Sequence, residues 1–171
     1  MRKNTQFLTQ AAIIAALYAV MTHLQNLILP GSASWAIQLR LSEALTVLAF
    51  FTPAAIPGLA MGCLVFNITY AAALPLDFLV GTLATVLAAQ CMWWSRKLKI
   101  KDLPLVGFAM PALFNALLVG WELTAYMGEA SFSVNALSVA LGELAVVLSM
   151  GASLYCAIRD RGLDKRLFGG K

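Results

Sequence analysis

Charged side chains occur inside stretches of this sequence that are otherwise apolar. Arg40 and Glu43 are three residues apart, which places both on one face of a helix, where they can neutralise each other or together contact a polar ligand. Glu122 and Glu143 have no basic residue near them in their own apolar stretches. A ligand with several hydrogen-bond donors would supply the missing partner, and the alternative is a protonated or internally bonded carboxyl group. These residue types indicate recognition of a polar molecule.

Motifs for nucleotide or metal chemistry are absent from the sequence. It contains neither the G-x-x-x-x-G-K-[ST] phosphate loop nor H-E-x-x-H, and His23 is its one histidine. Cys63, Cys91 and Cys156 lie in separate apolar stretches without a C-x-x-C pair, as is typical of packing residues. We therefore expect no enzymatic activity, no metal site and no cofactor.

The elements that must position these residues are predicted from composition. Hydrophobic residues make up 61% of the 171 residues and charged residues 12%, against roughly half and a quarter in a soluble domain. A membrane helix needs about 20 mostly apolar residues. Proline, glycine and charges divide the chain into six apolar stretches. We predict an all-α polytopic membrane protein, one transmembrane domain over residues 1–171, with six spans at about 7–29, 37–51, 54–73, 76–94, 103–126 and 134–158.

Basic residues predict the orientation of the spans. They form clusters at residues 2–3, 96–101 and 159–166, and such clusters stay on the cytoplasmic side of a membrane. Even numbers of crossings must therefore separate them, as the six spans allow. Both termini are then cytoplasmic, in a multi-pass protein of the plasma membrane, and the net charge of +4 gives no reason to expect a nucleic-acid partner. The span at 37–51 is short and contains Arg40 and Glu43, so it either crosses steeply or is re-entrant.

Most polar side chains within the spans then fall in the outer half of the membrane or near its midplane. Charged groups in a span cost at least about 2.5 kcal/mol each, so they normally face a cavity or one another. An outward-facing polar pocket is predicted, with the substrate-binding candidates Glu143, Glu122, Arg40, Glu43, Asn67, Trp121 and Tyr126. The aromatic residues either stack on a flat ring or belong to an interfacial belt. Asp77 is near the start of a predicted helix, where a carboxylate interacts favourably with the helix dipole. We therefore interpret it as a capping residue.

A row of small residues follows the first predicted span. Ala11, Ala15 and Ala19 recur every four residues, with Ala12 and Ala16 beside them. Small residues at this spacing let another helix approach closely in lipid. The row either contacts a partner subunit or packs against the protein's own helices.

Three segments resemble the QueT-type family of queuosine-precursor transporters. They are RLSEALTVL at residues 40–48, FTPAAIPGL at 51–59 and PLDFLVGTLAT at 75–85. The resemblance runs over nearly the full length, and residues 40–85 are its most specific part. Members of this family are six-helix S components of energy-coupling factor transporters, which capture a vitamin or similar micronutrient from outside the cell.

This resemblance implies the partners and the substrate. The partners are a membrane-embedded coupling subunit, which meets the alanine-rich first helix, and two cytoplasmic ATPase subunits, which would account for the missing phosphate loop. The substrate is a 7-deazaguanine such as preQ0, preQ1 or queuine, a flat ring rich in hydrogen-bond groups. A carboxylate can accept from a ring N–H and an exocyclic amine together. The resemblance transfers no ligand contacts residue by residue.

Two other functions are compatible with the same residues. A secondary transporter or channel that works alone would use Arg40, Glu43 and Glu143 as an ion or proton pathway. An integral-membrane enzyme or an assembly factor is the other alternative, although the lone His23 is a poor candidate for a general base.

Overall fold

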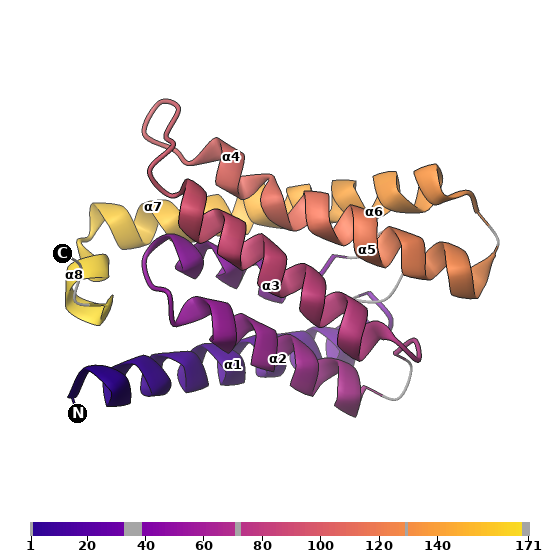
Figure 1. Ribbon diagram of the computed structural model, residues 1–171, viewed down its shortest axis with the longest axis horizontal. Helices are drawn as coiled ribbons and strands as arrows, with labels where there is room; N and C mark the ends of the chain where they lie inside the picture. The colour runs from indigo at the N-terminus through magenta and orange to yellow at the C-terminus, as the bar shows by residue number, and fades with distance from the viewer. Residues whose placement is uncertain (1, 33–38, 71–72, 129, 169–171) are drawn as a thin grey trace.

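The computed structural model describes residues 2–32, 39–70, 73–128 and 130–168, and these residues form helices without a strand (Figure 1). The all-α class is therefore confirmed. The elements in chain order are α1 (Arg2–Ile28), the 3₁₀ helix η1 (Leu41–Phe50), α2 (Ala55–Thr69), α3 (Asp77–Ser95), α4 (Leu105–Phe108), α5 (Met110–Met127), α6 (Phe132–Val146), the π-helical turn η2 (Val147–Gly151), α7 (Ala152–Asp160) and α8 (Leu163–Phe168).

Helix lengths divide the predicted spans into two groups. Within the described residues, four helical segments are long and apolar enough to cross a membrane: Lys3–Ile28, Asp77–Ser95, Leu105–Met127 and Phe132–Asp160. The helices η1 and α2 are shorter, with 10 and 15 residues. At 2.0 and 1.5 Å per residue they extend over about 20 and 22 Å, less than the roughly 30 Å of a hydrocarbon core. The first two residues of the predicted 37–51 span lie outside the described residues.

Helix ends follow local sequence. Gly128 closes α5 with φ +63°, a left-handed conformation that glycine adopts without strain. Pro111 lies in the first turn of α5, where its missing N–H is not needed. The last long helix is continuous from residue 132 to residue 160 except for the π-helical turn at its centre.

The long helices pack side by side in an elongated bundle (Figure 1). α1 packs on α2, α2 on α3, α3 on α5, and α5 on α6, while η1 contacts both α1 and the η2–α7 part of the last helix. All residues of η1 except Leu41 are buried. The 3₁₀ helix is therefore the central element that closes the bundle between its first and last helices.

α1 and α2 approach so closely that two positions of α2 accept only glycine. A Cβ atom at Gly62 would lie 2.6 Å from the Tyr18 Cβ and 2.8 Å from the Ala15 carbonyl oxygen. At Gly58 it would lie 2.8 Å from the Ala11 carbonyl oxygen. Gly58 and Gly62 are four residues apart, the small-xxx-small spacing of close helix contacts in membranes.

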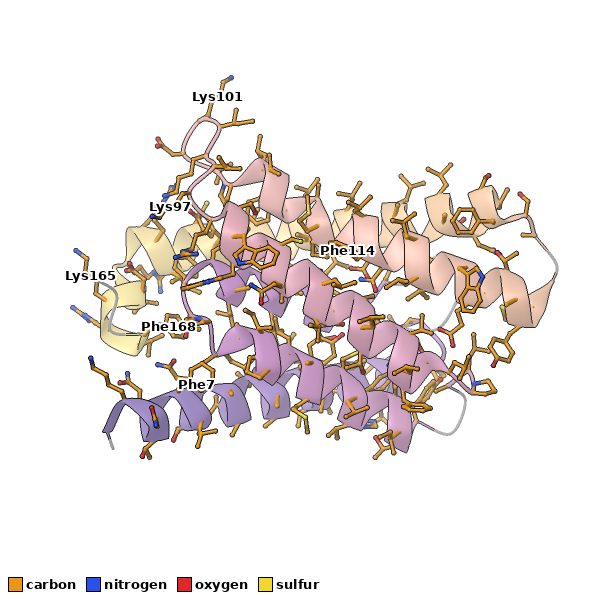
Figure 2. All side chains as sticks on the ribbon, in the orientation of Figure 1. Phe7, Lys97, Lys101, Phe114, Lys165 and Phe168 are labelled. Atoms are coloured by element: carbon orange, nitrogen blue, oxygen red, sulfur yellow. The ribbon has the colours of Figure 1, made fainter. Side chains whose placement is uncertain are left out.

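One end of the bundle carries both termini and the loop between α3 and α4 (Figure 1). Lys97, Lys101 and Lys165 all project from this end (Figure 2). We call it the basic end. Nearby, the interior is aromatic, because the ring of Phe50 packs edge-on against Phe108 and Tyr155 at centroid distances of 5.4 and 5.5 Å.

Candidate functional site

Arg40 immediately precedes η1. It therefore lies at the opposite end of this helix from Phe50 and the aromatic residues around Phe50. Its side chain is 2% exposed, and its Nη2 lies 3.4 Å from Oδ2 of Asp77, which is also buried. Nη1 lies 4.0 Å from Sγ of Cys63, and the guanidinium carbon is 6.0 Å from the centre of the Phe66 ring. The sequence suggested Glu43 as a neutralising partner on the same face; in the described residues Asp77 lies within ion-pair distance of Arg40, and the charges of Arg40 and Glu43 also act on each other.

Asp77 is the first residue of α3, as expected for a carboxylate near a helix N-terminus. It has a second role that sequence reasoning missed, because its carboxylate is buried against Arg40. The Asn67 amide nitrogen donates to the Asp77 carbonyl oxygen at 2.8 Å, which ties α2 to α3. Gly81 leaves the room for this arrangement, since a Cβ there would lie 2.9 Å from Asn67 Nδ2 and 3.1 Å from Asp77 Oδ1.

Glu43 lies one helical turn after Arg40 and faces α1. The Tyr18 hydroxyl donates a hydrogen bond to its Oε1, and Oε2 is buried without a hydrogen-bond partner in the described part of the chain. The neighbouring contact between α1 and η1 is also polar, with the Thr22 hydroxyl 2.7 Å from that of Ser42. Tyr18 was not among the predicted site residues, and no local pattern relates it to Glu43, because the two residues lie 25 positions apart in the sequence.

Glu122 and Glu143 bring two more carboxylates into the same interior from α5 and α6. Their side chains are 0% and 1% exposed. Within the described residues, neither carboxylate oxygen of Glu122 has a hydrogen-bond partner, and Oε2 of Glu143 has none. The Arg40 charge acts on both, Asp77 acts on Glu122, and Glu43 acts on Glu143. The four carboxylates therefore form one electrostatic group around a single guanidinium.

We call this group the central polar cluster; its members are Tyr18, Arg40, Glu43, Cys63, Asn67, Asp77, Glu122 and Glu143. It brings together five of the seven predicted substrate-binding residues, from η1, α2, α5 and α6. Asn115 is a further candidate that the sequence reasoning missed. It is 3% exposed and seven residues before Glu122 on α5, so it shares the inner face, and its Nδ2 has no partner among the described residues.

Trp121 and Tyr126 are not brought into the central polar cluster. Their side chains are 53% and 45% exposed. Trp121 precedes Glu122 on α5, and consecutive residues of a helix point in different directions, so burial of Glu122 turns Trp121 outward. Their role in stacking stays a prediction, and their exposure fits the interfacial belt that was the alternative.

Metal binding finds no support in the described residues, which contain no group of three or more histidine, cysteine, aspartate or glutamate side chains able to hold an ion. His23 lies outside the central polar cluster, exposed, with Nε2 2.9 Å from the Thr69 hydroxyl. The arrangement is suited to binding a polar ligand, because it offers hydrogen-bond acceptors and buried charge.

Comparison with known families decides the identity. The sequence model described as QueT transporter matches residues 8–160, almost the whole chain. The chain belongs to the QueT transporter family. No significant match was found among curated proteins or among solved structures. Family membership confirms the resemblance seen in the sequence, and it indicates a membrane protein that transports a small molecule.

In this QueT family member the predicted partner-binding alanines lie on two sides of α1. Ala11, Ala15 and Ala19 are buried or half-buried, and the backbone of the first two contacts the α2 glycines. Ala12 and Ala16 are exposed. The row of small residues therefore serves internal packing on one side and leaves a smooth exposed strip on the other.

Proposed function

We propose that this QueT family member is the substrate-binding S component of an energy-coupling factor importer. It captures a queuosine precursor of the 7-deazaguanine class, such as preQ0, preQ1 or queuine, from outside the cell for ATP-driven uptake. The observation that carries the proposal is the central polar cluster, in which buried carboxylate oxygens of Glu43, Glu122 and Glu143 have no hydrogen-bond donor among the described residues. Buried acceptors of this kind are costly unless a ligand supplies donors.

The proposed orientation has six crossings of the plasma membrane, with the basic end and both termini in the cytoplasm. Support comes from the position of Lys97, Lys101 and Lys165 at the end that also holds the termini (Figure 2). Basic residues stay on the cytoplasmic side. The start of η1, where Arg40 anchors the central polar cluster, then lies toward the outside, as a capture site requires.

The chemistry of a 7-deazaguanine complements the cluster. Its ring N–H and exocyclic amine form a double donor edge that one carboxylate can accept, and its carbonyl oxygen can accept from Arg40 or from an amide. Charge refines the choice of substrate, since the described cluster holds one guanidinium and four carboxylates. preQ1 carries an aminomethyl group that is cationic at neutral pH, whereas preQ0 carries a neutral nitrile at the same position. A cationic amine on the ligand would favour the ionised form of buried carboxyl groups such as Glu122 and Glu143, which favours preQ1 or the amine-bearing queuine over preQ0.

Calorimetric titration of the purified, detergent-solubilised chain without partner subunits tests this proposal. We expect preQ1 to bind, with an affinity at least about tenfold higher than that of preQ0, which corresponds to roughly 1.4 kcal/mol. Riboflavin, thiamin and biotin serve as controls and should give no heat of binding.

Three outcomes would contradict parts of the proposal. Failure of every deazaguanine to bind would reject the substrate class, and equal affinity for preQ1 and preQ0 would reject the charge argument alone. Uptake of preQ1 by vesicles that contain this chain without ATPase subunits would favour the stand-alone transporter, in which the intramembrane Arg and Glu residues form an ion pathway.

The proposed partners are a membrane coupling subunit and two cytoplasmic ATPases, with the exposed strip of α1 as the contact. We expect Ala16→Trp to prevent co-purification with the coupling subunit, because Ala16 is exposed and a large ring there blocks close approach of a helix. Substrate binding and thermal stability of the isolated chain should not change. Pull-down from a membrane co-expressing all subunits measures the first effect, and calorimetry measures the second.

Gly62→Val is the matched control, because it changes the contact between α1 and α2 inside the chain and not the exposed strip of α1. It should lower the melting temperature of the isolated chain, because the added atoms meet Tyr18 and the Ala15 backbone, and overpacking costs about 1–3 kcal/mol. Normal assembly of the Ala16→Trp variant would remove α1 from the proposed partner interface.

A further inference from the structure

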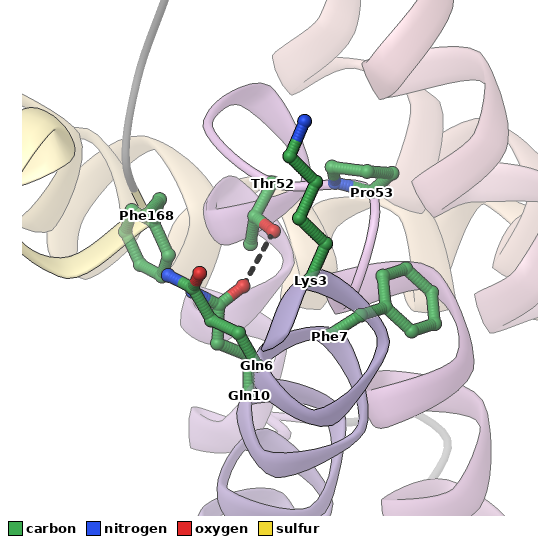
Figure 3. A pocket seen from close by; sticks show the side chains of 7 residues that line it. All are labelled: Lys3, Gln6, Phe7, Gln10, Thr52, Pro53 and Phe168. Atoms are coloured by element: carbon green, nitrogen blue, oxygen red, sulfur yellow. Dashed lines mark hydrogen bonds between the residues drawn. The ribbon is translucent and has the colours of Figure 1, made fainter. Parts of the chain in front are cut away.

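A small polar pocket opens at the basic end, between the first turns of α1, the loop that joins η1 to α2, and the end of α8 (Figure 3). Its volume is about 170 Å³. The lining residues are Lys3, Gln6, Phe7, Gln10, Thr52, Pro53 and Phe168, among which Lys3 carries the only charge. Lys3 is exposed and extends beside Thr52 and Pro53 (Figure 3). The pocket thus offers one ammonium group and several neutral polar groups to a ligand.

An apolar groove of about 390 Å³ runs beside this pocket, between α1 and the α7–α8 end of the chain. Its walls come from Ile13 and Leu17 on α1 and Ile158 and Leu163 at the C-terminal end, and Leu45 and Leu48 of η1 also line it. From Gln10 to Leu17 the groove follows α1 for about 10 Å, at 1.5 Å per residue. It therefore extends from the basic end toward the middle of the bundle.

The two hollows meet at Gln10 and Phe168, which line both. Gln10 is held in place from two sides. Its Nε2 donates to the Leu167 carbonyl oxygen at 2.9 Å, and its Oε1 accepts from the Thr52 hydroxyl at 3.1 Å. The junction thus links α1 to α8 and to the η1–α2 loop, and it joins a polar mouth to an apolar groove.

We propose that the pocket and the groove together bind one anionic phospholipid, with its phosphate against Lys3 and an acyl chain in the groove. The charge of the site fits this ligand, because neither set of lining residues contains a carboxylate. Lys97, Lys101 and Lys165 add positive potential at the same end (Figure 2). Basic pockets between membrane helices on the cytoplasmic side bind anionic headgroups, and the apolar lining of the groove suits an acyl chain.

Charge favours a lipid over a helix of another protein, because an apolar helix could fill the groove but would offer no phosphate to Lys3 at its polar end. A free phosphate is also a poor fit, because one exposed ammonium group binds an anion weakly in water, while the apolar walls would contribute nothing.

Thermal unfolding of the full chain in detergent, with added short-chain lipids, tests the site. We expect dioctanoyl phosphatidylglycerol to raise the melting temperature by about 5–10 °C at a concentration near 100 times its Kd. Dioctanoyl phosphatidylcholine, with the same acyl chains and no net charge, should give a smaller shift, and inorganic phosphate should give none.

Two variants separate the headgroup from the acyl chain. Lys3→Gln should remove the difference between the two lipids, whereas Lys101→Gln, which changes a lysine outside the pocket, should reduce it only slightly. Ile13→Trp should reduce the shift with both lipids, because the ring occupies the groove. Equal shifts with both lipids, an unchanged difference in Lys3→Gln, an unchanged shift in Ile13→Trp, or an equal shift with inorganic phosphate would each overturn the lipid assignment.

Discussion

Replacing Glu122 with glutamine is expected to weaken preQ1 binding by about 10- to 100-fold while the protein stays folded. The substitution removes a negative charge and keeps the shape of the side chain. Glu122 is 0% exposed, and neither of its oxygens has a hydrogen-bond partner in the described part of the chain, so the change breaks no internal hydrogen bond that the structure contains. A hydrogen bond to a charged group contributes about 1.5–3 kcal/mol. Calorimetric titration with preQ1 measures the loss, and Glu143→Gln should act in the same direction.

The matched control is Asp102→Asn, the same chemical change at an exposed residue of the basic end. It should leave the affinity for preQ1 unchanged. Binding of preQ0 gives a second comparison, because removal of a negative charge from the site lowers the affinity for a neutral ligand less than the affinity for a cationic one. If both Glu122→Gln and Glu143→Gln bind preQ1 with wild-type affinity, these carboxylates do not contact the ligand and the site is wrongly assigned.

Four of the six predicted spans coincide with helices long enough to cross a membrane, because the boundaries of these helices depend on local signals. Pro75 and Gly128 mark chain turns that the structure places next to helix ends, and charged residues mark the ends at the basic side. A 3₁₀ helix at residues 41–50 was not predicted. Its ten residues include the polar Ser42, Glu43 and Thr46, and so short a stretch carries no period that distinguishes it from an α-helix. Its geometry depends on the helices that surround it.

Pairing within the central polar cluster was predicted only in part. Sequence spacing relates residues on one helix, which is why Arg40 was considered together with Glu43. The ion pair with Asp77 joins residues 37 positions apart, and the hydrogen bond from Tyr18 to Glu43 joins residues 25 apart. Contacts of this kind follow from how α1, η1 and α3 pack, which no short pattern in one sequence encodes.

The helix that contacts the alanine row could likewise not be predicted from the pattern of α1 alone. A period of four residues predicts that α1 has a smooth face but not which helix covers it. Gly58 and Gly62 on α2 are the missing information, because they let α2 approach the backbone of Ala11 and Ala15. The same spacing of small residues on a second helix was present in the sequence and would have indicated an internal contact.

Removing the Arg40 guanidinium is expected to give the largest loss of stability. Arg40→Met leaves the buried carboxylate of Asp77 without its ion-pair partner and removes the positive charge that acts on Glu43, Glu122 and Glu143. Removing one partner of a buried pair costs about 3–5 kcal/mol, which corresponds to a fall of about 6–20 °C in melting temperature for a chain of this size. Thermal unfolding in detergent measures this change, and substrate binding should be lost as well.

A second ion pair in the chain supplies the control for this change. Arg159 and Asp160 lie closer together, at 2.8 Å against 3.4 Å, but their side chains are 37% and 61% exposed. Exposed pairs contribute at most about 1 kcal/mol, so Arg159→Met should lower the melting temperature by only about 4 °C or less. A double-mutant cycle isolates the buried contact, because Arg40→Met should cost less when Asp77 is already asparagine. An equal cost in both backgrounds would show that Arg40 and Asp77 do not stabilise each other, and Arg40 would then be held in the bundle by Glu43, Glu122 and Glu143 instead.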